Sequence, residues 1–177
     1  GIWEQHGGQV EETCRVIDDL LVNGANATAG AEYTHVPADV DMVITQGRLA
    51  QTTFPNDKLA GFTSDFRKAY KQDLLSPIQM FLCIIACWSA ARLRTEFWIP
   101  RTQLFGSRVS PVNFSRIPIW SYQLMAVLLA VAMSSCVDDV ICIERLETVG
   151  SAYVCWRELC NLLGWDVPDS KSPPPER

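Results

Sequence analysis

The stretch SSCVDDVICIE, residues 134–144, constrains the fold most, because it sets two adjacent carboxylates among apolar β-branched residues. Its valines and isoleucines have the composition of a buried strand or a tight hairpin. A buried, unpaired carboxylate costs on the order of several kcal/mol, so Asp138 and Asp139 need water or a neutralising partner. The stretch alone leaves two interpretations open: a turn that faces water, or a metal site.

Length and composition bound the class of protein. A chain of 177 residues is expected to form one domain with its own core. The hydrophobic content of 48% and the six tryptophans indicate a globular rather than a disordered chain. The net charge of -5 argues against a free-standing nucleic-acid binder, which is usually basic. An acidic metal-binding module within a larger protein still fits.

The cysteines bear on the cellular compartment, and the cysteines and histidines together bear on whether a zinc site is expected. The seven cysteines contain no C-x-x-C pair, and their odd number and apolar surroundings predict reduced, buried thiols in an intracellular protein of cytoplasm or nucleus. With only His6 and His35, no spacing supports a zinc site. The start GIWEQHGG lacks the charged segment and apolar run of a signal peptide, so we expect a protein that is not secreted.

Two apolar stretches, residues 78–93 and 124–133, raise the question of a membrane. Both are shorter than the roughly 20 apolar residues that a transmembrane helix needs. We therefore expect them to be buried core, with no membrane partner.

The pattern along the chain predicts strands interleaved with helices. Without the regular spacing of βαβ units, this order favours an α+β layer structure. The expected elements are a loop-rich start (1–35), a helix (38–52), a strand running into a turn (59–72), a hairpin around Pro100, a helix with Pro118 in it (110–135), a strand–turn–strand unit (134–144), a helix that ends at Gly164 (147–164) and an extended tail (168–177).

A metal site at residues 138–139 would need a third carboxylate from another strand. Two-metal phosphoryl or nucleotidyl transfer uses hard oxygen ligands around ions about 4 Å apart. Asp65 ends the short apolar segment GFTSD and is the natural candidate. Its alternative role is an N-cap for the turn that follows.

Five segments together resemble the reverse transcriptases. SDFRKAYKQ resembles motif A, LFGSRVSPVNF motif B, CVDD motif C, and LGWDVPDSKS motif D. CRVIDDLLVNGAN is similar to the fingers segment that carries a basic residue, an Ile-Asp and a later Asn. All five follow the family's order over residues 13–175. The pattern is most similar to retroelements that use a tyrosine recombinase.

The resemblance implies a fold and an activity. The fold is an α+β right-hand polymerase palm, an antiparallel sheet with helices packed on one face. Residues 1–60 would be partial fingers, 61–167 the palm and 168–177 the tail of a single domain. The activity is RNA-directed DNA polymerisation, in which two Mg²⁺ ions (or Mn²⁺) assist transfer of a deoxynucleotide to a primer 3′-hydroxyl. The partners are an RNA or DNA template with its primer, and the chain is a candidate piece of a longer polyprotein.

The resemblance also assigns roles to residues. Asp65, Asp138 and Asp139 would bind the metal ions, and Lys171 would protonate the pyrophosphate leaving group or balance charge. The nucleotide-binding candidates are Arg15 at the triphosphate, Phe66 through its backbone carbonyl, Tyr70 beneath the sugar, and Gly106, Ser110 and Pro111, which would let backbone approach the nucleotide and template. Taken singly, these residues are also ordinary core aromatics, surface charges and turn residues.

Departures from the family keep other functions open. Cys136 stands where Y-x-D-D has its Tyr, and an acidic chain without a thumb region is expected to bind template-primer weakly. The second hypothesis is therefore a catalytically inactive palm remnant. A third is a phosphoacceptor signalling domain with Asp65 as acceptor and VIDDLL as its acidic pair. That fold requires parallel βα units.

Overall fold

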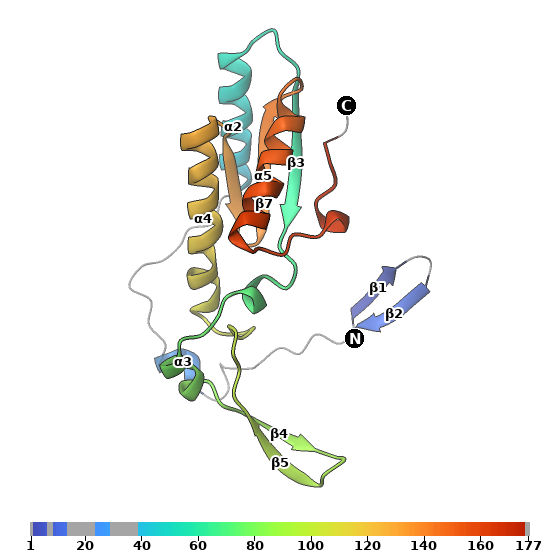
Figure 1. The fold of residues 1–177 in the computed structure, drawn as a ribbon, viewed down its shortest axis with the longest axis vertical. Helices are drawn as coiled ribbons and strands as arrows, with labels where there is room; N and C mark the ends of the chain where they lie inside the picture. The colour runs from blue at the N-terminus through green and yellow to red at the C-terminus, as the bar shows by residue number, and fades with distance from the viewer. Residues whose placement is uncertain (1, 7–8, 14–23, 29–38, 176–177) are drawn as a thin grey trace.

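The computed structural model describes residues 2–6, 9–13, 24–28 and 39–175 (Figure 1). The strands are β1 (Ile2–His6), β2 (Gln9–Thr13), β3 (Leu59–Asp65), β4 (Ile85–Ser89), β5 (Arg94–Trp98), β6 (Met133–Cys136) and β7 (Asp139–Arg145). The helices are α1 (Ala25–Thr28), α2 (Val40–Thr53), α3 (Pro77–Leu82), α4 (Ser110–Leu129) and α5 (Val149–Leu163), with 3₁₀ turns η1 (Ala69–Gln72) and η2 (Asp169–Lys171). A mixed helix-and-strand fold with small antiparallel sheets is therefore confirmed.

The central sheet has three antiparallel strands in the order β3-β7-β6. Two separate ribbons, β1–β2 and β4–β5, are also antiparallel. Every strand pair in the described part of the chain is antiparallel, so this part lacks the parallel βα units that a phosphoacceptor domain requires.

One face of the central sheet carries the core. On β3 and β7, alternate residues such as Phe62 and Val140 are buried, and helix α5 packs on them. Trp156 of α5 is fully buried and lies edge-to-face with Phe66 at 6.2 Å between ring centroids. Buried residues recur every three or four positions along α5, which is the pattern of a helix with one apolar face. Gly164 ends this helix in the left-handed conformation, as predicted.

Helix α2 covers the opposite face of the same sheet. A Cβ added at Gly47 would lie 3.5 Å from Ile143, and Ser134 donates a hydrogen bond to Gln46. Ile143 and Ser134 alternate with residues that face the core, so α2 lies on the other side, as Figure 1 shows behind β7. The prediction of helices on one face only is wrong. Strand β7 is apolar on both faces, and each apolar face needs a cover.

The first apolar stretch, residues 78–93, is not buried core. The expectation that both apolar stretches are buried is therefore wrong for this one. Residues 78–93 form α3, β4 and the β4–β5 turn, and Ile78 and Leu82 are 75% and 80% exposed. The aromatic hairpin near Pro100 does form, but its partner strand is the upstream β4. Neither α3 nor the β4–β5 ribbon packs extensively against another described helix or strand, so their apolar side chains are left uncovered. The second apolar stretch divides between buried residues and the exposed end of α4.

No helix among the described residues has both the length and the apolar character needed to cross a bilayer. Helix α4 is the longest, and it contains Pro118 as predicted, with the proline ring buried.

The tail does not leave the fold at residue 168, contrary to the prediction. It forms η2, and Ser172 is fully buried against β3, where its hydroxyl lies 2.9 Å from the hydroxyl of Ser64. The physical reason is that a buried serine hydroxyl needs a partner, and each serine satisfies the other. Beyond η2, Pro173 and its neighbours line an open groove of about 490 Å³ along β3 and β7.

Candidate metal and nucleotide site

The carboxylate pair lies at the tip of the β6–β7 hairpin. Cys136 pairs with Asp139, so the turn consists of Val137 and Asp138 alone. Val137 has φ of +60°, a region that favours glycine and is costly for a β-branched residue. Such strain costs about 1–3 kcal/mol and persists only where the surrounding structure enforces it. The turn interpretation of the stretch is therefore confirmed, because a two-residue hairpin turn presents the aspartates, and the metal interpretation stays a prediction.

Asp65 lies directly across from Asp139. It is the last residue of β3 and pairs with the first residue of β7. Burial raises the pKa of Asp138, and the negative charges of Asp139 and Asp65 raise it further. Burial and Asp65 likewise raise the pKa of Asp139. The fold therefore brings the three predicted carboxylates within electrostatic range of one another.

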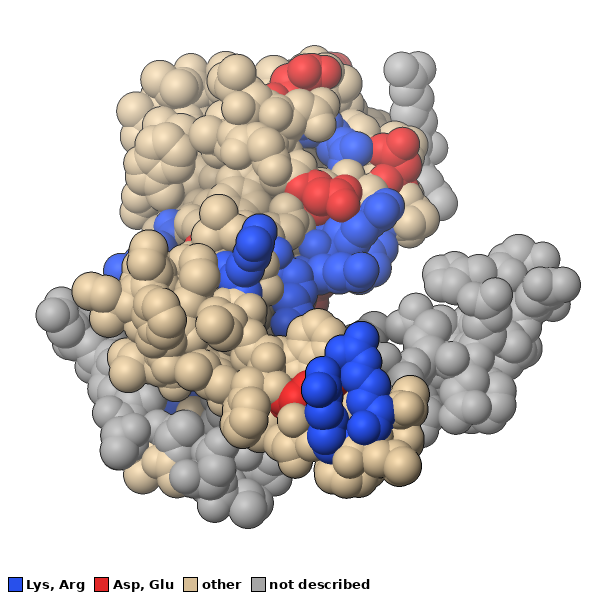
Figure 2. Space-filling model, turned by 60° about the horizontal axis from the view of Figure 1, so that its bottom comes forward, with Lys and Arg blue, Asp and Glu red and all other residues tan. Residues whose placement is uncertain are grey.

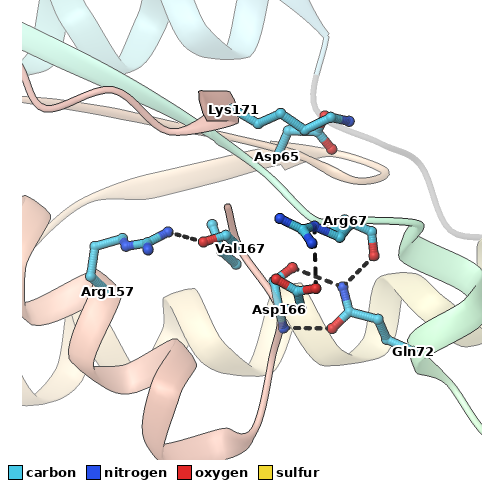
Figure 3. Close-up of polar contacts among 7 residues, drawn as sticks. All are labelled: Asp65, Arg67, Gln72, Arg157, Asp166, Val167 and Lys171. Carbon is cyan, nitrogen blue, oxygen red and sulfur yellow. Dashed lines mark hydrogen bonds and ion pairs between the residues drawn. The ribbon is translucent and has the colours of Figure 1, made fainter. Parts of the chain in front are cut away.

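Lys171 reaches this site from the tail. Its Nζ lies 2.5 Å from Oδ2 of Asp65, and its positive charge lowers the pKa of Asp138 and Asp139 against the raising effects (Figure 3). The lysine is thus placed with the predicted catalytic residues. The sequence did not indicate that this lysine would pair with Asp65, a predicted metal ligand.

The donor set suits a hard divalent cation in chemical type. Carboxylate oxygens are the ligands that Mg²⁺ and Mn²⁺ prefer. Within residues 2–6, 9–13, 24–28 and 39–175, however, no three His, Cys, Asp or Glu side chains are gathered closely enough to hold an ion. Asp65 would have to exchange Lys171 for a metal ion, and side chains at the hairpin tip would have to turn toward it.

Tyr70, in η1, lies within electrostatic range of Asp138 at the hairpin tip. Its ring packs edge-on against Phe105 and Phe114, with centroids at 5.1 and 5.6 Å. Burial raises the pKa of Tyr70, and the charge of Asp138 raises it further. Tyr70 is therefore both a packed aromatic and a neighbour of the carboxylates. The two roles foreseen for it are compatible.

The predicted motif B loop has a defined backbone geometry. Gly106 has φ of +85°, and the buried Ser110 donates to the carbonyl of Leu104 at 2.9 Å. Pro111 follows in the first turn of α4. Asn26 binds this loop twice: its side chain donates to the Gly106 carbonyl and accepts from the Arg108 amide, both at 2.8 Å. Arg15 lies outside the described residues. The side chain of Phe66 is core, and a role for its carbonyl stays a prediction.

The segments before and after the site are joined by a network that the sequence did not indicate. The Gln72 side chain donates to the carbonyls of Arg67 and Asp166 and accepts from the Asp166 amide (Figure 3). The Arg67 amide donates to the Asp166 carbonyl at 2.9 Å, and the side chains pair at 3.3 Å. These bonds fix the residues after α5 against those after β3. No local sequence pattern signals such long-range pairing.

Basic side chains gather on one face although the chain is acidic overall. Arg67, Lys68 and Lys71 all follow β3 within six residues. Figure 2 shows Lys and Arg side chains across the middle of this face and a further group toward its lower edge. Arg92 and Arg94 of the β4–β5 ribbon both contact Glu96, at 2.7 and 3.6 Å. Net charge alone therefore does not describe the surface beside the site.

Neither the protein-family models nor the curated proteins include a match to this chain.

Proposed function

We propose that this chain is the palm of an RNA-directed DNA polymerase, which transfers a deoxynucleotide to a primer 3′-hydroxyl. The observation that carries the proposal is the pairing of Asp65 with Asp139 beside Asp138 in the strained turn. Two carboxylates at the ends of adjacent strands, with a third in the turn beside them, offer the oxygen ligands that a two-metal site requires. In this scheme residues 61–167 are the palm and residues 1–60 are partial fingers.

The side chains then have distinct tasks. When bound, two divalent ions would activate the attacking hydroxyl and stabilise the leaving oxygen. Asp65 and Asp138 would hold those ions, with Asp139 supporting them. Tyr70, held by Phe105 and Phe114, would form the floor beneath the sugar of the nucleotide. Lys171 would donate a proton to pyrophosphate or balance its charge, once it has left Asp65.

The inactive remnant is the second candidate, and one observation favours it. Cys136 replaces the aromatic of the family motif and is exposed beside Asp139, so nothing bulky supports a primer end there. The contact of Lys171 with Asp65 is equally compatible with a site that no longer binds metal.

A primer-extension assay separates the two candidates. The wild-type chain is incubated with an oligo(dT)-primed RNA template, deoxynucleotides and Mg²⁺ or Mn²⁺. We expect metal-dependent extension that falls at least roughly 100-fold in Asp138→Asn. Asp41→Asn, an exposed carboxylate on α2, is the matched control and should keep the wild-type rate. Equal extension by wild type and Asp138→Asn rejects the polymerase proposal.

A further inference from the structure

A chain of buried hydrogen bonds lies directly behind the candidate site. Trp156 donates from its indole to the Ser64 hydroxyl at 2.9 Å, and this hydroxyl lies 2.9 Å from that of Ser172. Tyr153 donates to the backbone carbonyl of Ser172 at 2.6 Å. Ser64 and Ser172 are 2% and 0% exposed. Together these hydrogen bonds join α5, β3 and the tail.

These buried hydrogen bonds fix the register of the tail on β3. Ser64 precedes Asp65, and Ser172 follows Lys171, so the serine pair sets these two charged residues side by side. A buried hydroxyl that loses a partner is costly, and a shift of the tail by one residue would leave Ser64 with only the bond from Trp156. The η2 turn adds the bond from the Lys171 amide to the Pro168 carbonyl at 3.0 Å.

The position of the lysine has a consequence for cations. Asp65 is partly buried, and the Lys171 ammonium holds one of its two carboxylate oxygens at 2.5 Å. A divalent ion bound to this carboxylate would lie close to the Lys171 ammonium, which already contacts one of the carboxylate oxygens. The two cations repel each other at such short range even in a solvent-exposed site.

We propose that Ser64 and Ser172 are positioning residues that seat Lys171 on Asp65, so that the lysine holds the place of a divalent cation and yields Asp65 when the cation binds. This proposal rests on the proposed function, because it takes Asp65 as a metal ligand. It adds that the tail sets the affinity of the site for metal.

The test measures the affinity of the full chain for Mn²⁺, from the free-ion signal in electron paramagnetic resonance. Lys171→Met should bind Mn²⁺ about three- to tenfold more tightly than wild type, because the competing charge is gone. Lys171→Arg should stay near the wild-type affinity. Ser172→Ala should bind more tightly by a smaller factor, and Ser172→Thr, which keeps the hydroxyl, should be close to wild type.

Two matched controls separate the positioning of Lys171 from the general effects of losing a charge or a buried hydroxyl. Lys68→Met removes an exposed charge from the same region, and Ser121→Ala removes a buried hydroxyl from α4. Both should change the affinity less than twofold.

The outcomes are distinct. Loss of Mn²⁺ binding in Asp138→Asn together with unchanged or weaker binding in Lys171→Met overturns the role of the lysine and leaves the metal site standing. Binding that does not depend on Asp138, or no binding by wild type and Lys171→Met alike, overturns both proposals. Lys171→Met leaves the serine pair intact, so it tests the role of the lysine even where Ser172→Ala fails to fold. A folded Ser172→Ala that binds Mn²⁺ as wild type does overturns the role of the serine pair.

Discussion

At the scale of single residues, Asp138 is held where its charge is unfavourable. Burial and two neighbouring carboxylates raise its pKa above the ordinary value. The folded chain therefore binds this proton more readily than the unfolded chain does. As pH rises through the window between the ordinary and the raised pKa, the group's contribution to folding stability falls. A site that keeps such a residue gives up stability for function.

Asp138→Asn should therefore raise the free energy of unfolding at neutral pH. The gain should be below about 1 kcal/mol, because the side chain is partly exposed and solvent screens its neighbours. It should shrink as pH falls through the raised pKa, where the wild-type carboxyl is also neutral. Urea denaturation of both proteins at several pH values measures this difference. A less stable variant at pH 7 contradicts the assignment of an electrostatic cost.

The cysteines differ sharply in predicted reactivity. Burial raises the pKa of Cys142 and of Cys160 to about 12, whereas Cys136 and Cys87 are exposed. Iodoacetamide, which reacts with thiolates, should label the two exposed thiols in the native protein and reach the buried pair only after unfolding. Peptide mapping by mass spectrometry provides the readout. Labelling of Cys142 as fast as Cys136 would contradict the hairpin packing.

The positions of the three aspartates, at a strand end or in a turn, could be predicted from the local sequence pattern, and their role as metal ligands stays a prediction. The exposed cysteines could not, since apolar neighbours in sequence do not fix which side of a hairpin faces water. The contact of Lys171 with Asp65 and the bonds of Asn26 and Gln72 join positions far apart in the chain. Only the folded chain brings such partners together.

At the scale of elements, β3 and β7 approach unusually closely at one point. A Cβ at Gly61 would lie 2.7 Å from the backbone carbonyl of Cys142. Gly61→Ala should lower the free energy of unfolding by about 1–3 kcal/mol, because backbone must shift to relieve the overlap. Thermal unfolding followed by circular dichroism measures the change.

Gly150→Ala in α5 is the matched control, because no atom lies within 4 Å of an added Cβ there. It should stabilise the chain by about 0.5–1 kcal/mol through helix propensity. Equal effects of the two substitutions would contradict the close strand contact.

Gln72 connects the segment after β3 to the segment after α5 through side-chain hydrogen bonds. Gln72→Ala removes three hydrogen bonds to the backbone of Arg67 and Asp166 and should cost about 1–2 kcal/mol of stability. Gln51→Ala, which loses one exposed bond of 3.3 Å, should cost less than about 0.5 kcal/mol. Hydrogen exchange of residues 164–168 should rise in Gln72→Ala only.

Helical and strand periodicity predicted α2, β3, the β6–β7 hairpin and α5 from sequence. It failed on residues 78–93, because apolar content does not distinguish a core segment from a ribbon whose faces are open. It also failed on the tail, where three prolines suggested an extended exit and the serine pair instead holds the chain on β3.

At the scale of the whole molecule, the fold divides into a packed centre and an exposed arm of α3, β4 and β5. Phe97 of the arm is 73% exposed, whereas Phe114 in the core is fully buried. Phe97→Ser should change the free energy of unfolding by less than about 0.5 kcal/mol, and Phe114→Ala should cost about 3–5 kcal/mol. Chemical denaturation of the two variants compares them directly. A large loss in Phe97→Ser would mean that the arm packs onto the centre.

The proposed function depends on the convergence of Asp65, Asp138 and Asp139 on shared divalent ions. Crystals of the full chain grown with Mn²⁺, measured at the manganese absorption edge, locate such ions by anomalous scattering. We predict an ion bonded to oxygens of both Asp65 and Asp138, with Lys171 displaced from Asp65. A second ion would lie about 3.5–4 Å away when nucleotide is present. Carboxylates that stay more than about 8 Å apart, with manganese bound elsewhere, would contradict it.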